Sequence, residues 1–154
     1  MAKKYLKDFH QGATISLGKV YLSKEAIIEF AQKYDPQPFH LDEAAAKPIF
    51  GSLIASGWQT ASLCQSLLVK SVLNDTASLG SPGVSELRFH LPVLPNQYLE
   101  GLMHIIEVRP SKSKPFMGLV TCRMEMRNEA AKIVLSMVGT FMVETGASVA
   151  NQQG

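Results

Sequence analysis

The sequence predicts an α+β fold, in which a curved antiparallel sheet wraps around one long central helix. Three observations support this fold class: a strand-like segment opens the chain, a helix-rich segment follows, and strand-like segments fill the second half. The 154 residues suit one domain, and 46% hydrophobic with 18% charged residues is ordinary for a globular protein. We therefore expect a single domain over residues 1–143 and a flexible C-terminal tail over residues 144–154.

The first strand is predicted over residues 14–22, and an amphipathic helix follows it. Ser23 is a good N-cap residue for this helix. Apolar residues then recur with the period of one helix face, at Ile27, Phe30, Ala31 and Tyr34. The helix must end near Tyr34, because Asp35 precedes Pro36 and a residue before proline avoids the α conformation. Asp35 is therefore expected at a helix exit, with its side chain free to point into a cavity.

The central helix is predicted over residues 57–73, with Ser56 as its N-cap. Its apolar surface covers most of the girth, and Lys70 is its one charged residue. A helix of this kind is usually buried. Before it, residues 41–47 are expected to form one or two helical turns that end before Pro48.

Four strands are predicted in the second half, over residues 87–91, 98–108, 116–127 and 133–143. Apolar and polar residues alternate in three of them, and the strand over residues 98–108 is less cleanly patterned. Short turns such as "LPVLPNQ" and "RNEAA" separate the strands, which predicts antiparallel meander pairing.

Composition excludes several classes of function and location. The chain carries 15 basic and 13 acidic residues, so a nucleic-acid partner is not expected. No apolar stretch approaches the length of a membrane span, and the first residues lack the apolar core of a signal peptide. Cys64 and Cys122 lie far apart without metal-ligand spacing, and both are interpreted as small core residues. These features favour a protein of the cytoplasm, a reducing compartment, with no metal.

The stretch "YDPQPFHLD" places Asp35 and His40 five residues apart with two prolines between them. General acid–base chemistry needs two groups whose separation is held constant, and Pro36 and Pro38 restrict the chain between them. The alternative interpretation is a helix-ending turn, in which Asp35 caps the helix and His40 has only a structural role.

The start of the central helix offers a second chemical feature. The backbone N–H groups of Gly57 and Trp58 have no partner within the helix, and they lie at the positive end of its dipole. Such groups can hold a developing oxyanion, so the carbonyl of an acyl group could bind there within reach of Asp35 and His40. An ordinary capped helix start is the alternative.

The stretches "YDPQPFHLD" and "KPIFGSLIASGW" resemble the MaoC-like acyl dehydratase family, which includes (R)-specific enoyl-CoA hydratases. That family's motif is roughly Gly-Asp-x-Asn-Pro-hydrophobic-His-x-Asp, and the chain matches it at five positions, namely Asp35, Pro38, Phe39, His40 and Asp42. The resemblance extends over roughly residues 14–143. It implies a hot-dog fold, usually dimeric or of higher order, which acts on an acyl-CoA or acyl-carrier-protein thioester without a metal or redox cofactor.

The resemblance also implies roles for individual residues. Asp35 and His40 would activate water for syn addition across a trans-2-enoyl thioester, or for the reverse dehydration. Gly57 would donate its N–H to the thioester carbonyl. The chain departs from the family pattern at three positions, where Tyr34, Gln37 and Ser56 replace the glycine, the asparagine and a frequent histidine.

Several further residues are candidates for substrate binding. Gln37, Ser56 and Trp58 flank the predicted pair and helix start, although core packing is the simpler expectation for Trp58. Lys112 and Lys114 form a basic loop that could meet the phosphates of CoA or an acidic carrier protein, or could be a solvated hairpin. Asp42 is expected to bond local backbone. The remaining histidines show no partner spacing, so His10, His90 and His104 receive no role.

Two other functions remain open from the residues alone. Hot-dog thioesterases commonly place a catalytic carboxylate on the central helix, whereas residues 57–73 contain no Asp or Glu. A non-catalytic module that binds acyl thioesters or partners is the other alternative, and the replacements at Tyr34, Gln37 and Ser56 favour it. We expect Asp35 and His40 to point apart, with no cavity between them, if the protein is such a module.

Overall fold

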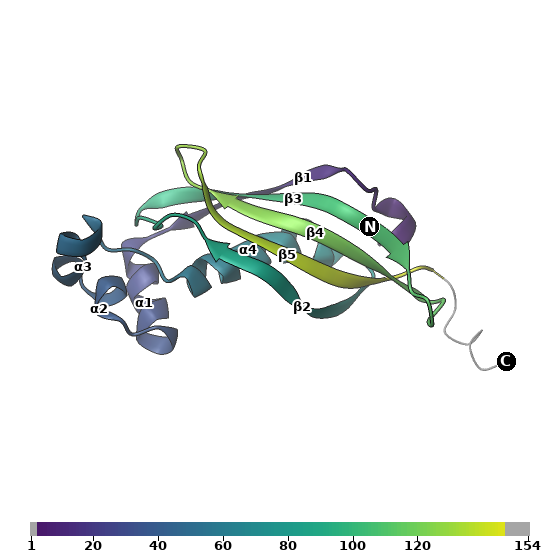
Figure 1. Ribbon diagram of the computed structural model, residues 1–154, viewed down its shortest axis with the longest axis horizontal. Helices are drawn as coiled ribbons and strands as arrows, with labels where there is room; N and C mark the ends of the chain where they lie inside the picture. Colours follow the sequence, from purple (N-terminus) through teal and green to yellow (C-terminus); the bar gives the residue numbers. More distant parts are fainter. Residues whose placement is uncertain (1–2, 147–154) are drawn as a thin grey trace.

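The computed structural model describes residues 3–146, which form a five-stranded antiparallel sheet wrapped around one long helix (Figure 1). The elements in chain order are η1 (Leu6–Asp8), β1 (Thr14–Leu22), α1 (Lys24–Tyr34), α2 (Pro38–Leu41), α3 (Glu43–Phe50), α4 (Gly57–Ser71), η2 (Leu73–Asp75), β2 (Ser78–Phe89), β3 (Gln97–Pro110), β4 (Met117–Arg127) and β5 (Ile133–Glu144). This is the predicted α+β class. Residues 147–154 of the predicted tail lie outside the described residues, whereas Glu144, its first predicted residue, is the last residue of β5.

The sheet has the strand order β1-β3-β4-β5-β2. Strands β3, β4 and β5 form the predicted meander, and the turn over residues 128–132 joins β4 to β5. The expectation of a continuous meander is wrong for β2. This strand pairs with β5 at the far edge of the sheet, so residues 90–96 carry the chain across to β3. Local periodicity could not show this, because it identifies strands and not their partners.

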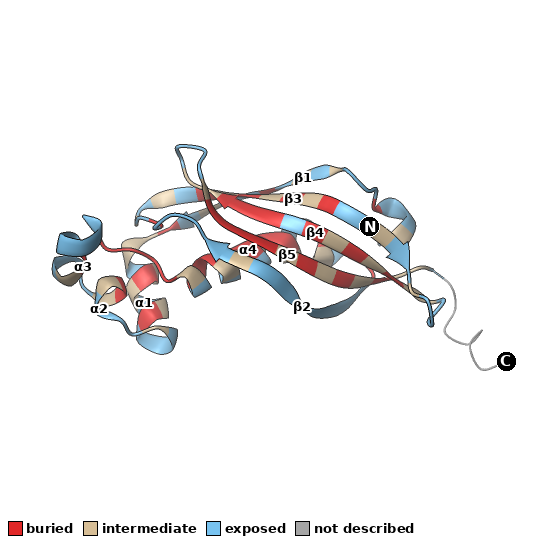
Figure 2. Cartoon of the chain, viewed as in Figure 1, coloured by how far each residue is buried: buried red, intermediate tan, exposed pale blue. Residues whose placement is uncertain are grey.

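Helix α4 lies along the concave side of the sheet, where its apolar residues form the core with the inward-facing strand residues (Figure 2). Cys64, Leu67 and Leu68 are all buried. The alternation over residues 133–143 predicts one apolar face, and its residues Leu135, Met137, Gly139, Phe141 and Val143 are buried in β5, whereas Ile133 at the start of the strand is only half-buried. The sheet and α4 thus share one core, and the start of α4 lies toward α1–α3 (Figure 1).

Two element boundaries differ from the sequence prediction. Strand β2 begins at Ser78, well before the predicted residue 87, because an exposed edge strand with bulges near Gly80 and Gly83 shows no alternation. Helix α3 continues through Pro48 to Phe50 and ends at Gly51, whose φ of 78° gives it the left-handed conformation that stops a helix. The proline removes only one backbone donor from this short helix.

The N-terminal caps follow the prediction. The Ser23 hydroxyl accepts a hydrogen bond from Ala26 N–H at the start of α1, and the Ser56 hydroxyl accepts one from Trp58 N–H at the start of α4. Asp42 caps α3 through a bond from Ala44 N–H, as expected for a local role. Within residues 3–146, no helix is long and apolar enough to cross a membrane.

Candidate active site

Asp35 and His40 come together because a helix ends between them and a second one begins. Asp35 is the C-cap of α1, where its N–H still donates to the Ala31 carbonyl while its φ of −153° takes the chain out of the helix. Pro38 opens α2 at the first helical position, which its restricted φ suits. His40 follows in that short helix and is buried. Pro36 therefore lies between the two helices and Pro38 begins the second, so that the prolines occupy the short segment that joins Asp35 to His40.

The carboxylate of Asp35 has three side-chain partners. Its Oδ2 lies 3.3 Å from His40 Nε2 and accepts a hydrogen bond of 2.7 Å from the Ser56 hydroxyl. Its Oδ1 accepts one of 2.8 Å from Gln37 Nε2. The hydrogen bond from Ser56 is the largest influence on the pKa of Asp35 and lowers it below 3.8. Desolvation raises this pKa, whereas the Gln37 hydrogen bond and the Coulombic interaction with His40 lower it further. Asp35 is therefore ionised at neutral pH.

The other ring nitrogen of His40 determines its tautomer. Nδ1 lies 2.8 Å from the backbone carbonyl oxygen of Ile54. A carbonyl oxygen can only accept a hydrogen bond, so Nδ1 carries a hydrogen and donates it. In neutral His40 the lone pair is consequently on Nε2, the nitrogen that faces Asp35. Two hydrogen-bond acceptors, Asp35 Oδ2 and His40 Nε2, then lie side by side, and one water molecule can donate a hydrogen to each of them.

Gly57 supplies the first helical N–H of α4, immediately after the cap residue Ser56. Among the described residues this N–H has no hydrogen-bond acceptor, so it is available to a ligand. The ring of Phe89 packs on Gly57, and a Cβ added at residue 57 would lie 2.6 Å from three ring atoms. This close approach explains why glycine occupies the start of the helix.

A cavity of about 370 Å³ joins these features. Its wall is made by residues from the α1–α2 segment, the segment before α4 and the start of that helix, the end of β2 and the segment after it, and β5: Asp35, Gln37, His40, Ile54, Ala55, Gly57, Trp58, Thr60, Phe89, His90, Leu91, Pro92, Val93 and Val134. Most of these residues are apolar, as is usual in pockets that bind small molecules. The acid–base pair and Gly57, whose N–H has no acceptor among the described residues, thus line one largely apolar cavity.

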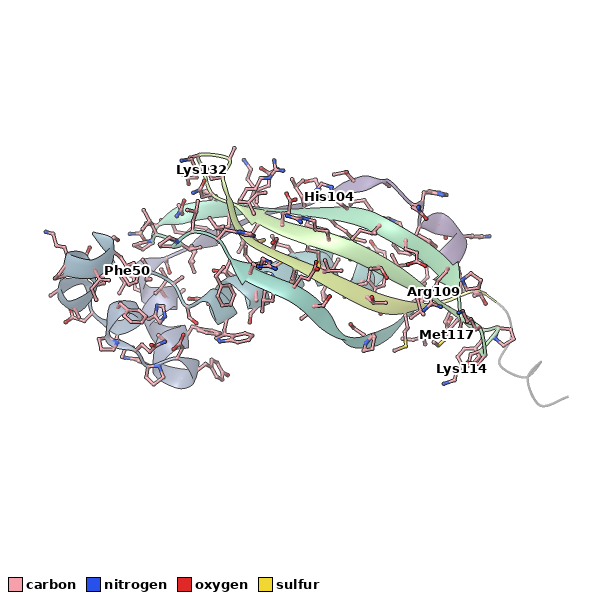
Figure 3. All side chains as sticks on the ribbon, in the orientation of Figure 1. Phe50, His104, Arg109, Lys114, Met117 and Lys132 are labelled. Atoms are coloured by element: carbon pink, nitrogen blue, oxygen red, sulfur yellow. The ribbon has the colours of Figure 1, made fainter. Side chains whose placement is uncertain are left out.

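The structure brings some of the predicted substrate-binding residues to this cavity and leaves others away from it. Gln37 and Trp58 line it, and Trp58 is 58% exposed, so the expectation that it packs in the core is wrong. Ser56 is fully buried behind the wall, with its hydroxyl on Asp35. Lys112 and Lys114 do not line the cavity. Both lie in the exposed turn between β3 and β4. Lys114 is at the opposite end of the molecule from Phe50 of α3 (Figure 3).

Two cavity residues escaped the sequence analysis. His90 received no role, yet it lines the cavity and its Nε2 lies 2.7 Å from the Ser136 hydroxyl. Thr60 is buried in the first turns of α4, and its hydroxyl has no hydrogen-bond partner among residues 3–146. Neither residue has a distinctive sequence spacing, because each reaches the cavity only through the packing of β2 and α4.

Within the described residues there is neither a cluster of metal ligands nor a reactive thiol. Within residues 3–146, three or more His, Cys, Asp or Glu side chains do not gather at any place where they could hold a metal ion. Cys64 and Cys122 are free thiols in the core, as predicted. Burial raises the pKa of Cys64 to about 12 and that of Cys122 to about 11, so neither thiol is a nucleophile near neutral pH.

Comparison with known proteins connects this geometry to a family. Residues 7–123 match the family described as MaoC like domain. The chain belongs to the MaoC-like family. The resemblance first inferred from "YDPQPFHLD" is thereby confirmed, and the sheet wrapped around α4 is the hot-dog fold that it implied.

Individual relatives agree with this assignment. The crystal structure of a MaoC-like dehydratase from Rhodospirillum rubrum is 34% identical and covers 94% of this chain and 99% of its own, with a TM-score of 0.86. The (R)-hydratase from A. caviae shares the fold at a TM-score of 0.71, with 23% identity over 88% of this chain and 97% of its own. The uncharacterized protein YdeM of Bacillus subtilis is 26% identical over 125 residues, which are 80% of this chain and 87% of YdeM.

Proposed function

We propose that this MaoC-like protein adds water to a trans-2-enoyl thioester to give a 3-hydroxyacyl thioester, or catalyses the reverse dehydration. The observation that carries the proposal is the 3.3 Å approach of His40 Nε2 to Asp35 Oδ2 at the wall of the cavity. The dehydratase from Rhodospirillum rubrum and the (R)-hydratase from A. caviae, which share the fold, support this reaction class.

Water is held beside the two acceptors in this proposal, within hydrogen-bond reach of both. It donates one hydrogen to Asp35 Oδ2 and the other to the lone pair of His40 Nε2, so that its own lone pair faces the β carbon of the substrate. Ile54 holds the imidazole in the required tautomer through Nδ1. The geometry orients the nucleophile before any bond changes, which is the main contribution that a positioned pair can make.

Addition then moves one proton through His40. The water oxygen bonds to the β carbon while Nε2 takes a water proton, and the electrons of the carbon–carbon double bond move to the thioester carbonyl oxygen. Gly57 N–H donates a hydrogen bond to this developing oxyanion. The imidazolium returns the proton to the α carbon, so hydroxyl and hydrogen arrive from the same side of the double bond. The sum is the addition of one water molecule, with no other reactant.

The apolar wall formed by Trp58, Phe89 and Leu91 is the proposed acyl-binding surface. The thioester carrier, CoA or an acyl carrier protein, would lie outside the cavity. Lys112 and Lys114 of the same chain are too remote in the fold to guide the acyl group into it, so a contact of theirs would be with a distant part of the carrier. The proposed substrate is an acyl-CoA or acyl-carrier-protein thioester, and the proposed reaction needs no metal or redox cofactor.

A homodimer or higher homo-oligomer of the cytoplasm is also part of the proposal. The edge strand β2 has exposed apolar side chains, including Leu79 and Val84, which suits a further subunit. Structures that share the hot-dog fold include the two-component HadBC and ChsH1-ChsH2 complexes from Mycobacterium tuberculosis.

The test is the loss of ultraviolet absorbance of the conjugated enoyl thioester when the protein meets crotonyl-CoA and longer or branched 2-enoyl-CoAs. We expect Asp35→Asn and His40→Ala to lower turnover by roughly 100-fold or more, because a positioned acid–base group contributes about that much. Asp42→Asn is the matched control, since this carboxylate caps α3 and does not line the cavity.

The outcomes separate the alternatives. Turnover that survives both Asp35→Asn and His40→Ala would remove the assigned pair. Release of free thiol in place of hydration would indicate a thioesterase, although α4 carries no Asp or Glu. Thioester binding without turnover across the panel would indicate a non-catalytic acyl-binding module.

A further inference from the structure

Ser56 connects the first turn of α4 to the carboxylate of Asp35. Its hydroxyl has one hydrogen, which it donates to Asp35 Oδ2 over 2.7 Å. The same oxygen accepts the N–H of Trp58 over 3.3 Å, which caps the helix. Because the residue is fully buried and its one hydrogen is already donated, Ser56 has no hydrogen left for a substrate. The earlier expectation that Ser56 binds substrate is therefore replaced by a role directed at Asp35.

The oxygen that Ser56 contacts is the one that faces His40. Asp35 Oδ2 receives the Ser56 hydrogen and also lies 3.3 Å from His40 Nε2. A hydrogen bond to a carboxylate oxygen stabilises the ionised form and makes that oxygen a poorer proton acceptor. A proton that enters the space between Asp35 and His40 is thereby directed to Nε2, the one position of the imidazole that can still accept it.

We propose that Ser56 is a positioning residue that keeps Asp35 ionised and leaves His40 as the group that carries the proton in the reaction. This inference rests on the proposed hydration for its effect on turnover, but its effect on Asp35 is independent of any substrate. The lowered pKa of Asp35, whose largest cause is the Ser56 bond, agrees with it.

The surroundings leave few other groups that could set the charge of Asp35. The titratable side chains that line the cavity, within the described residues, are Asp35 itself, His40 from α2 and His90 after β2. From α1 and the loop after it, Gln37 contributes a neutral donor to Oδ1. From the start of α4, the cap residue Ser56 donates its hydroxyl hydrogen to Oδ2. His90 is bonded to Ser136 and not to Asp35. The side chains in direct contact with the Asp35 carboxylate are therefore those of Ser56, Gln37 and His40.

Ser56 also ties the two halves of the site together. It immediately precedes Gly57, whose free N–H is the proposed oxyanion donor, and it is 21 residues away from Asp35 in the chain. A single side chain thus holds the start of α4 against the acid–base pair. Loss of its hydroxyl should alter both the protonation of Asp35 and the spacing between the pair and the carbonyl site.

The first test follows the side-chain carboxyl carbon of Asp35 by ¹³C NMR as a function of pH, with Asp35→Asn to assign the signal. We expect the midpoint to move to higher pH in Ser56→Ala and in Ser56→Gly, and to stay near that of wild type in Ser56→Thr, which keeps a hydroxyl. Ser23→Ala is the matched control, because Ser23 caps α1 in the same way without touching Asp35. Unchanged midpoints in Ser56→Ala and Ser56→Gly, with the fold retained, would overturn the inference.

The second test is the pH profile of kcat/KM for the hydration. Removal of the Ser56 hydroxyl should shift the acidic limb to higher pH and lower kcat by roughly 10- to 100-fold near neutral pH, because Asp35 is no longer held in place. Ser56→Thr should restore both. A fall in thermal stability with an unchanged pH profile would show a capping role alone and contradict the proposal. If wild type shows no turnover, the hydration proposal fails, whereas the NMR titration still decides the role of Ser56.

Discussion

The Nε2 atom of His40 lies 3.3 Å from Oδ2 of Asp35, and this approach is built into the fold before any ligand binds. Each partner is held by further hydrogen bonds: Ile54 accepts the Nδ1 hydrogen of His40, Ser56 donates to Oδ2 of Asp35, and Gln37 donates to Oδ1. Because their positions are determined by protein contacts, the pair needs little rearrangement to act on water.

Gly57 and Phe89 should be energetically coupled. Gly57→Ala would place a methyl group 2.6 Å from three atoms of the Phe89 ring, so the ring must move. We expect Gly57→Ala to destabilise wild type, and to cost less in a Phe89→Ala background, with a coupling energy of about 1–2 kcal/mol in the free energies of unfolding of the four proteins. Equal costs in both backgrounds would show that the half-exposed ring moves aside freely.

Glu125 should make the stability depend on pH in the acidic range. It is buried on β4, and its pKa lies below 4.5: desolvation, the largest influence, is outweighed by Arg127, His104 and Arg123. A carboxylate with a lowered pKa stabilises the fold above its ordinary value, and this contribution is lost as pH falls through the folded-state value. We expect Glu125→Gln to lower the free energy of unfolding by about 1–2 kcal/mol at pH 7, and by progressively less below pH 4.5.

The measurement is urea denaturation of both proteins from pH 7 down to the acid transition. Glu29→Gln is the control, since Glu29 pairs with Lys33 at 3.7 Å on an exposed helix face and should change stability by less than about 0.5 kcal/mol. A pH-independent difference between wild type and Glu125→Gln would argue against the ionic role of Glu125.

The two cysteines should be unreactive in the folded protein. Cys64 and Cys122 are both completely buried, and their pKa values of about 12 and 11 leave almost no thiolate at pH 8. With Ellman's reagent we expect no rapid thiol reaction in buffer and two thiols per chain in guanidinium chloride. A fast thiol in native protein would mean that α4 or β4 opens locally.

Trp58 should report ligand binding. It is the one tryptophan of the chain, lines the cavity and is 58% exposed. An acyl group in the cavity would replace water around the indole, so its emission should shift to shorter wavelength as a non-hydrolysable acyl-CoA analogue is added. Free CoA is the control for binding outside the cavity. The same shift with free CoA would show that the acyl group is not what contacts Trp58.

The local features of the fold could be predicted from the sequence because short-range physics determines them. The caps at Ser23 and Ser56, the helix exit at Asp35 and the period of β4 and β5 each depend on residues that are near neighbours in the chain. The motif from Asp35 to His40 is equally local, because Pro36 and Pro38 restrict the backbone between these two residues. For the same reason its resemblance to the MaoC-like family was recognisable without a structure.

Contacts between distant segments were decided by the tertiary structure alone. The pairing of β2 with β5, the Phe89 ring on Gly57, the arrival of His90 at the cavity and the bond from Ser56 to Asp35 each join residues that are more than 20 positions apart. Periodicity tells which face of an element is apolar but not which element covers it. The sequence therefore determined the elements and the reactive pair, whereas packing decided which side chains surround that pair and how they set its charge.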